Sequence, residues 1–272
     1  MKARRHVSRI YMAIVFFFLY SPIAVMAVFS FNSSKSRTVW TGFTLDWYAK
    51  LFHNETIINS LGVTIIVALI ASLVSTVLGT SAAIGIFNMK KKTRGLIMYF
   101  TYLPLLNPEI VTGVSLMLLF VFAGMQMSLF TLIMSHIAFC VPYVILNVLP
   151  KLRQMDMSLC EAAMDLGCNQ RGVFGKVVLP EIMPGVLTGF LMSITYSIDD
   201  FVISYFTHGA DSQNLSVTIY SMTRRKVSPE INALSTIIFL IVLTVLIIMN
   251  VVDSRRMKND IKLGKLRRRD MV

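Results

Sequence analysis

Three acidic residues lie within long apolar stretches of the sequence, where an ionisable side chain needs a physical reason. They are Glu109, Asp199 and Asp200, and the central parts of these stretches contain no Lys or Arg. A carboxylate near the middle of a bilayer costs about 2.5 to 3.5 kcal/mol on an insertion scale. We therefore expect the three carboxylates to face a cavity, a partner or the membrane interface. A path whose embedded charges are all negative favours a cation.

A stripe of small polar residues accompanies the two aspartates. It consists of Ser193, Ser197, Asp200 and Ser204. If this stretch is one helix, the spacing places the stripe on a single face, with Tyr196 beside it and Asp199 rotated by about 100°. One hypothesis is that the aspartates line a path for cations together with Tyr196 and Ser197, because an aromatic face also attracts an ammonium group. The alternative is that Asp199 caps or pairs at a helix end while the serines pack.

Glu109 stands beside a helix-breaking sequence. Asn107 and Pro108 precede it, and Pro104 interrupts the same stretch earlier. Because proline lacks a backbone N–H and clashes with the preceding turn, we expect a kinked or broken helix here. Broken helices beside ionisable groups are typical of transporter binding sites. The alternative is that Glu109 sits at a short break at the membrane interface.

The sequence lacks the arrangements that enzymes use to bind phosphates. The nearest match to the pattern G-x-x-x-x-G-K-[ST] runs from Gly167 to Gly172, but Val173 and Phe174 follow in place of Lys and Ser or Thr. The Lys that holds the phosphates is therefore absent. We expect this chain not to be an enzyme and to draw its energy from another chain.

The cysteines and histidines do not indicate a metal site. Cys140, Cys160 and Cys168 have no metal-ligand spacing. His136 lies inside an apolar stretch, where polar side chains commonly join helices by hydrogen bonds. We expect His136 to pack and to hydrogen-bond rather than to catalyse, and we expect no metal centre.

The elements that must position these residues are apolar helices. The chain has 272 residues, of which 55% are hydrophobic and 15% charged, whereas a typical soluble domain is about 25% charged. Runs of about 20 apolar residues are long enough to cross a bilayer. Six such runs occur, at residues 10–31, 57–87, 96–123, 129–149, 182–206 and 231–252. The expected fold is an all-α polytopic membrane protein with six transmembrane helices.

The basic residues indicate how these spans are oriented. The chain has 26 Lys and Arg against 14 Asp and Glu, a net charge of +12, and twenty of the 26 lie in the termini and in the second and fourth connections. By the positive-inside rule, both termini and these connections are cytoplasmic. The charge then reflects membrane insertion and attraction to anionic lipid, not nucleic-acid binding. The outward cluster of Arg224, Arg225 and Lys226 would either repel a cation or dock an acidic partner, and the sequence leaves its role open.

The expected organisation has no separate soluble domain. Residues 1–9 form a cytoplasmic N-terminus, 10–31 a retained anchor span, 57–252 the transmembrane domain and 253–272 a basic cytoplasmic tail. Gly185 and Gly189 form a G-x-x-x-G pattern in the fifth span. This pattern permits close helix crossing, either within the chain or with a second subunit.

The fourth connection, residues 150–181, contains signals for a short helix. Ser158 and Glu161 have the spacing of a capping box, in which each side chain satisfies a backbone N–H at the helix start. Gly167 is a favoured residue just beyond a helix C-terminus. These signals predict a helix between Ser158 and Gly167.

A second short helix is expected over residues 170–178, closed by Leu179 and Pro180. Two short helices separated by a glycine make a compact knob on the cytoplasmic side. The knob either docks a cytoplasmic partner or merely connects two spans.

This loop resembles the EAA motif of the permease subunits of bacterial ABC importers. The matching residues are Glu161, Ala162, Ala163, Gly167, Val177, Leu179 and Pro180, with Val177 where the family usually has Ile. The resemblance implies the fold of a type I importer permease and a coupling role for the loop, seated in a cleft of a cytoplasmic ATPase subunit. ATP would be bound by that partner subunit, and this chain would hold no cofactor.

A second resemblance concerns the fifth span. Residues 197–206 look like the corresponding segment of spermidine/putrescine importer permeases, and the short outward loop with Trp40 and Trp47 is similar to that of their smaller permease subunit. The resemblance implies polyamine import across the bacterial cytoplasmic membrane by alternating access. It also implies a heterodimer with a second permease, two ATPase subunits and a periplasmic polyamine-binding protein. Asp199, Asp200 and Glu109 would meet the ammonium groups.

Two other interpretations remain open from the sequence. The EAA-like loop does not specify the cargo, so a permease of the same class for Fe(III), thiamine or an oxyanion is the alternative. A membrane scaffold without transport is the alternative of a different class.

Overall fold

The computed structural model describes residues 2–34, 39–225, 229–241, 243–244 and 247. These residues form helices and connecting loops, with an isolated β-bridge between Asn32 and Phe43. The chain divides into two compact units, Met1–Asn54 with Met222–Val272, and Glu55–Ser221.

The first unit contains α1 (Lys2–Phe29) and α2 (Asp46–Phe52). The side chains of α1 from Ile10 onward are apolar and mostly exposed, as suits a helix surrounded by lipid. The loop between the two helices is organised around buried Asn32, whose side-chain Nδ2 donates to the Val39 carbonyl at 2.8 Å. The Trp47 indole donates to the Asn32 carbonyl at 2.7 Å, so this loop is anchored to α2.

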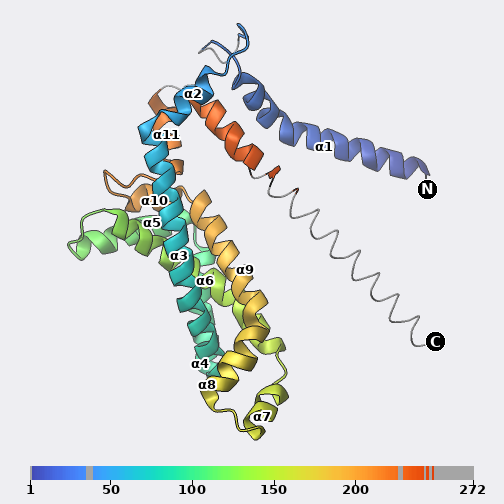
Figure 1. Ribbon diagram of the computed structural model, residues 1–272, viewed down its shortest axis with the longest axis vertical. Coiled ribbons are helices and arrows are strands. Elements are labelled where there is room, and N and C mark those ends of the chain that lie inside the picture. The colour runs from blue at the N-terminus through green and yellow to red at the C-terminus, as the bar shows by residue number, and fades with distance from the viewer. Residues whose placement is uncertain (1, 35–38, 226–228, 242, 245–246, 248–272) are drawn as a thin grey trace. The chain divides into compact units, whose positions relative to one another are not determined.

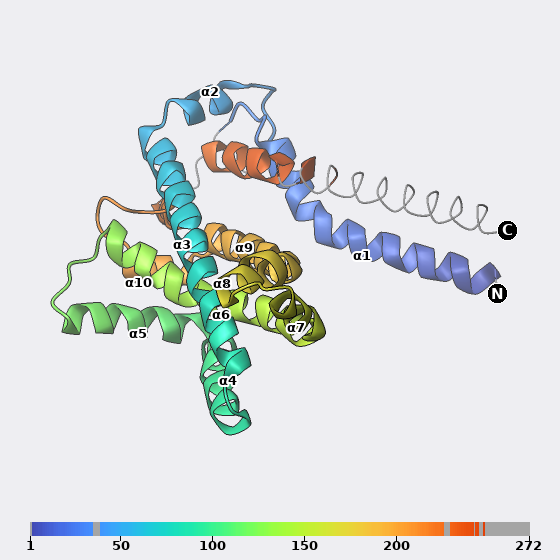
Figure 2. The ribbon, with the colours of Figure 1, turned by 60° about the horizontal axis from the view of Figure 1, so that its bottom comes forward.

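The second unit is built on three long helices that pack side by side, α3 (Glu55–Asn88), α6 (Leu129–Gln154) and α9 (Leu179–Asp199) (Figures 1 and 2). At about 1.5 Å per residue, α3 is about 50 Å long and exceeds the thickness of a bilayer core. Their shared core includes Ile86, Val148, Leu152 and Ile182 among its buried residues.

Glycines bring these helices into close contact around Val144 of α6. A Cβ atom added at Gly79 of α3 would lie 2.6 Å from the Val144 Cβ, and one at Gly189 of α9 would lie 3.1 Å from the Val144 Cα. A Cβ at Gly185 would lie 2.7 Å from the carbonyl oxygen of Asn147. The G-x-x-x-G pattern therefore serves a helix crossing within the chain, between α9 and α6.

The third predicted span is not one straight helix. It consists of α4 (Lys91–Leu106) and α5 (Glu109–Phe122), which are bent by 106° at the break between them. The expected break is confirmed, but it lies at Asn107 and Pro108, whereas Pro104 remains inside α4. Asn107 is extended, with ψ 145°, because the proline that follows disfavours a helical conformation for the residue before it.

The fifth predicted span is also interrupted, which the sequence analysis missed. The helix α9 ends at Asp199, Asp200 is extended, and a short helix, α10 (Val202–Thr207), follows. The serine stripe is therefore divided between two helices, and the expectation of one continuous helix through it is wrong. A loop then leads to α11 (Leu215–Arg225).

The fourth connection forms the expected knob at the end of α9 opposite α10 (Figure 1). Its first helix, α7 (Ser158–Asp165), is followed by Gly167 with φ +86°, the left-handed conformation that glycine adopts without strain. The predicted capping box is wrong, since Ser158 is already helical. Its backbone N–H instead donates to Asp156 Oδ1 at 3.0 Å.

The second helix of the knob is longer than expected. It begins as α8 (Gln170–Val173), passes through a π-helical turn, η1 (Phe174–Val178), and continues into α9. Leu179 and Pro180 do not close it. Proline is tolerated there because it lies in the first turn of α9, immediately after the π-helical turn has changed the bonding pattern.

Four stretches of the described residues are long and apolar enough to cross a membrane, namely Ser8–Phe29, Glu55–Asn88, Leu129–Gln154 and Gln170–Asp199. The bent α4–α5 pair is a fifth if it counts as one span. Pro229–Ile241 is a shorter apolar helix at the start of the sixth predicted span. The remainder of that span, apart from residues 243–244 and 247, and the basic tail at 253–272 lie outside the described residues.

Candidate functional site

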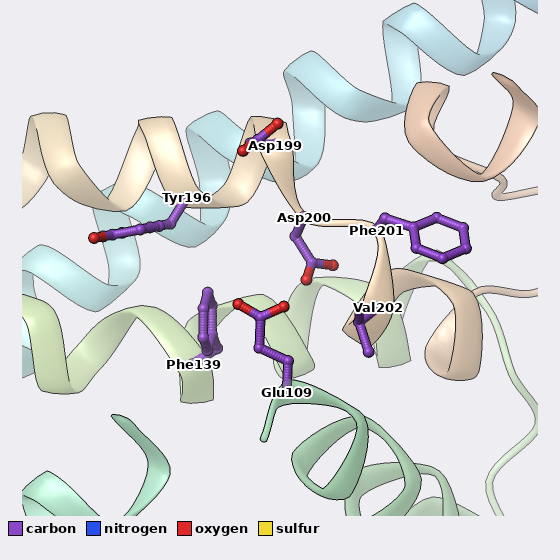
Figure 3. A pocket seen from close by; sticks show the side chains of 7 residues that line it. All are labelled: Glu109, Phe139, Tyr196, Asp199, Asp200, Phe201 and Val202. Carbon is purple, nitrogen blue, oxygen red and sulfur yellow. The ribbon is translucent and has the colours of Figure 1, made fainter. Parts of the chain in front are cut away.

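A cavity of about 150 Å³ lies where the two helix breaks of the second unit meet (Figure 3). Its lining residues are Glu109, Phe139, Tyr196, Asp199, Asp200, Phe201 and Val202. All three acidic residues singled out from the sequence are therefore brought together. The lining includes three carboxylates and neither Lys nor Arg, so the pocket attracts cations.

The breaks themselves place the carboxylates. Glu109 is the first residue of α5, Asp199 is the last residue of α9, and Asp200 lies in the gap before α10. Figure 3 shows the carboxylates of Glu109 and Asp200 turned toward one another across the pocket. Glu109 and Asp199 are exposed and Asp200 is buried.

Aromatic rings form one wall of the pocket. The ring of Tyr196 packs against that of Tyr143 at a tilt of 32°, with centroids 4.2 Å apart, and Phe139 meets Tyr196 edge-on at 6.2 Å. On the other side, Phe201 packs against Tyr220 at 4.7 Å. Aromatic faces next to carboxylates suit a ligand that carries both ammonium groups and a hydrocarbon chain.

Asp200 lines the pocket and also accepts hydrogen bonds from the first turn of α10. Its Oδ2 accepts hydrogen bonds from the Ser204 backbone N–H at 2.8 Å and from the Ser204 hydroxyl at 2.7 Å. Its Oδ1 accepts from the Ile203 N–H at 3.2 Å. The aspartate that caps a helix is thus Asp200, at the start of α10, and not Asp199 at the end of α9.

Ser197, predicted on the path for cations, is not among the residues that line the pocket. It is buried, and its hydroxyl lies 2.7 Å from His136 Nδ1. The second ring nitrogen of His136, Nε2, lies 2.9 Å from the Ser204 hydroxyl and 3.6 Å from Asp200 Oδ2. The expectation that His136 packs and hydrogen-bonds is confirmed.

Several residues of the site were not predicted from the sequence. Phe139 and Phe201 line the pocket, but an aromatic residue in an apolar run gives no signal that separates a binding role from packing. Asn214 donates from Nδ2 to the Ser204 hydroxyl at 2.7 Å, although it lies in a loop. Among the residues around the site, His136 is the one that the sequence could have indicated, because a titratable side chain within an apolar run suggests a polar role.

The first residues of the EAA-like set lie on α7 of the knob, whereas Leu179 and Pro180 lie in the first turn of α9. Glu161 and Ala162 on α7 are exposed, and Ala163 packs against the small core of Met155, Cys160 and Val173. Four apolar side chains of the same helix region are exposed, namely Met157, Leu159, Met164 and Leu166. Exposed apolar side chains on a rigid element are available for contact with a protein partner.

Outside the membrane-spanning segments, one carboxyl group of this region has a shifted pKa. The backbone N–H of Ser158, with its side chain, holds the pKa of Asp156 below its usual range. Within the part of the chain that the structure describes, no three His, Cys, Asp or Glu residues are grouped so that they could hold a metal ion.

Comparison with known proteins gives relatives over nearly the whole chain. The spermidine/putrescine transport system permease protein PotC of Escherichia coli K12 is 33% identical, over 92% of this chain and 95% of its own length. The putrescine transport system permease protein PotI of the same organism is 37% identical, over 82% of each chain. The resemblance to polyamine importer permeases stated from the sequence is confirmed.

The fold has a solved counterpart. The crystal structure of a bacterial ABC transporter involved in the import of the acidic polysaccharide alginate superposes with a TM-score of 0.71, over 93% of this chain and 96% of that chain. At 15% identity this likeness shows the fold alone.

Residues 75–257 match the model of the family described as binding-protein-dependent transport system inner membrane component. With its apolar helices, its broken spans and its relatives, this multi-pass membrane chain belongs to the family of inner-membrane components of binding-protein-dependent transport systems.

Proposed function

We propose that this chain is a permease subunit of an ATP-driven importer of polyamines, spermidine and putrescine. The pocket is the observation that supports the cargo most directly, because Glu109, Asp199 and Asp200 surround it beside aromatic rings. The relatives named as spermidine/putrescine and putrescine permeases support the same class of substrate.

The chemistry of the pocket matches a linear polycation. A carboxylate and an ammonium group form a charge-assisted hydrogen bond, and the methylene chain between ammonium groups packs on the faces of rings such as Tyr196 and Phe139. An oxyanion would be repelled by three carboxylates. Fe(III) and thiamine are cations as well, so an uptake assay has to separate them from polyamines.

The membrane arrangement that we propose has six spans and both termini in the cytoplasm. This follows from the excess of basic residues in the termini and in the second and fourth connections. The knob of α7 and α8 then faces the cytoplasm, and the pocket belongs to the other end of α9. The location is the bacterial cytoplasmic membrane.

The partners that we propose are a second permease subunit, two cytoplasmic ATPase subunits and a periplasmic polyamine-binding protein. The exposed apolar side chains Leu159, Met164 and Leu166 on the knob support docking to an ATPase subunit. The chain lacks a phosphate-binding Lys motif, so ATP would be bound and hydrolysed by that partner. Glu161, Ala162, Ala163 and Gly167 would form the contact.

A continuous helical connection supports alternating access as the mechanism. The helix that starts in the knob at Gln170 runs to Asp199 without a gap. A rigid-body motion of the knob is therefore delivered to the break at Asp200, where the pocket lies. Closure of the ATPase subunits would move the knob and change which side of the membrane the pocket opens to.

Uptake by the complete transporter in proteoliposomes tests this function. Vesicles with ATP and the loaded binding protein are compared for putrescine, spermidine, ferric ion, thiamine and an oxyanion. We expect ATP-dependent, saturable uptake of spermidine, putrescine or both. Uptake of another member of the panel without any polyamine uptake would overturn the proposal.

A further inference from the structure

A buried polar cluster lies beside the pocket and connects segments that are distant in sequence. It consists of His136 on α6, Ser197 on α9, Asp200 in the break, Ser204 on α10 and Asn214 just before α11. Each of these residues is more than nine-tenths buried. Asp200 is the member that also lines the pocket.

The hydrogen atoms of this cluster can be assigned by counting donors and acceptors around Ser204. Its hydroxyl has one hydrogen, which it donates to Asp200 Oδ2 at 2.7 Å. It must therefore accept from its other two neighbours, Asn214 Nδ2 at 2.7 Å and His136 Nε2 at 2.9 Å. His136 carries a hydrogen on Nε2.

The other ring nitrogen of His136 completes the assignment. Nδ1 lies 2.7 Å from the Ser197 hydroxyl, whose hydrogen it accepts when the imidazole is neutral. In this tautomer every hydroxyl and ring hydrogen of the cluster has one acceptor. The arrangement is therefore a one-way chain of donors, from Ser197 through His136 and Ser204 to Asp200.

The chain of donors leaves the two oxygens of Asp200 unequal. Oδ2 accepts two hydrogen bonds from Ser204, at 2.7 and 2.8 Å. Oδ1 accepts a single and longer bond, from the Ile203 N–H at 3.2 Å. Oδ1 therefore keeps a lone pair for a ligand in the pocket.

We propose that His136 is a positioning residue for the cargo site, acting through Ser204 to hold Asp200 with Oδ1 available to a ligand ammonium group. Without the donor at Nε2, Asn214 is the remaining donor to the Ser204 hydroxyl, which is then free to turn away from Asp200 Oδ2. Oδ2 then loses its shorter bond and the carboxylate loses its fixed orientation. This proposal rests on the proposed function, which supplies the cation.

Substitutions of His136 that keep or remove the Nε2 donor test the proposal in the complete transporter. Gln places an amide nitrogen near the position of Nε2, Asn reaches only the position of Nδ1, and Leu removes both nitrogens. We expect His136→Gln to keep spermidine uptake within about threefold of the wild type and His136→Asn and His136→Leu to lower it about tenfold, the effect of one hydrogen bond to a charged group. ATP hydrolysis stimulated by the loaded binding protein should change less than uptake.

Thr131→Val is the matched control. The Thr131 hydroxyl is equally buried and also joins α6 to α10, since it shares its one hydrogen between the carbonyl oxygens of Thr207 and Ser128, each 2.9 Å away, but it has no bond to Asp200. We expect this variant to retain uptake. Equal losses in Thr131→Val and His136→Asn would mean that general packing of α10 matters rather than the position of Asp200, and would overturn the proposal.

Asp200→Asn and Glu109→Gln separate this proposal from the proposed function. If both variants transport spermidine at the wild-type rate, the cargo site itself is wrong. If both lose uptake while His136→Asn and His136→Leu do not, only the positioning role fails. An equal loss of uptake in His136→Gln and His136→Asn would also overturn the positioning role. A double variant, His136→Asn with Asp200→Asn, whose loss of uptake is not the sum of the two single effects would support it.

Discussion

Two of the three carboxylates of the pocket, those of Glu109 and Asp200, are tolerated within apolar segments because each lies at the N-terminal start of a helix. Asp200 accepts backbone N–H bonds at the start of α10, and Glu109 lies in the first turn of α5, where the helix dipole favours a negative charge. At these two positions, the start of α5 and the start of α10, the helix break lowers the cost of the negative charge. The same breaks leave all three residues lining one pocket.

Neutralising single carboxylates should weaken transport without preventing insertion. We expect Asp199→Asn and Glu109→Gln each to lower spermidine uptake about tenfold, because each removes one charge-assisted bond to the cargo. Asp200→Asn should lower it further, since the bonds to Ser204 are disturbed as well. Uptake in proteoliposomes, with the amount of inserted protein measured in parallel, checks this prediction.

Glu181→Gln provides the control for these variants. Glu181 is an exposed carboxylate in the first turn of α9, away from the residues that line the pocket. It should transport as the wild type does. Wild-type uptake in all three single variants, Asp199→Asn, Glu109→Gln and Asp200→Asn, would show that the carboxylates are structural.

Asp156 should make the start of α7 sensitive to acid. Its pKa is lowered by the bonds from Ser158, so its stabilising effect is present above the ordinary pKa of an aspartate and is lost as the pH falls through the lowered value. We expect protection of the Ser158 amide from hydrogen exchange, corrected for the intrinsic rate, to decrease in that acidic range. Asp156→Asn should keep the protection and lose its pH dependence, because asparagine also accepts this bond. A pH dependence that persists in Asp156→Asn would assign the effect to another group.

Among the elements, the crossing of α3, α6 and α9 depends on the absence of side chains at glycines. We expect Gly79→Ala to lower the free energy of unfolding by about 1–3 kcal/mol, because the new methyl group would overlap Val144. Gly85→Ala is the control on the same helix, since nothing lies within 4 Å of its added Cβ. That variant should be neutral or more stable, by up to about 1 kcal/mol from helix propensity. Thermal unfolding in detergent measures both, and similar stabilities of the two variants would contradict the prediction.

The turn between α7 and α8 requires a left-handed residue at Gly167. With φ +86°, any L-residue is strained there although nothing lies within 4 Å of an added Cβ. We expect Gly167→Val to reduce uptake at least about tenfold through a misplaced knob, and Gly167→Asn to be milder because asparagine tolerates this conformation. Gly175→Ala, with open space and an ordinary φ, should transport normally. Normal uptake by Gly167→Val would remove the coupling role of this turn.

At the level of the whole second unit, the knob and the pocket are joined by one helical path from Gln170 to Asp199. The π-helical turn Phe174–Val178 lies between them and contains one residue more than an α-helical turn needs. Deleting Gly175 and Lys176 removes the extra residue and one more, and should rotate the knob by about 100° relative to α9. We expect the variant to insert but to hydrolyse ATP without uptake, measured as spermidine transported per ATP. Wild-type coupling in the deletion variant would show that the relative orientation is unimportant.

The sequence by itself determined the features that depend on local composition. Lengths of apolar runs predicted an all-α membrane protein, Pro108 predicted the break before Glu109, and Gly167 predicted the turn of the knob, because each reflects a property of a residue and its neighbours. The spacing around Glu161 led to the family in the same way.

The break after Asp199 was decided by tertiary structure, since neither proline nor glycine marks it. It is stabilised by contacts between residues far apart in sequence: His136 with Ser197 and Ser204, and Thr131 with Thr207. Those contacts buried Ser197 instead of placing it in the pocket, and they made Asp200 the cap. A local sequence pattern does not show which distant residues will become hydrogen-bond partners. Those partners are set only when the helices pack, because buried polar groups must then be satisfied.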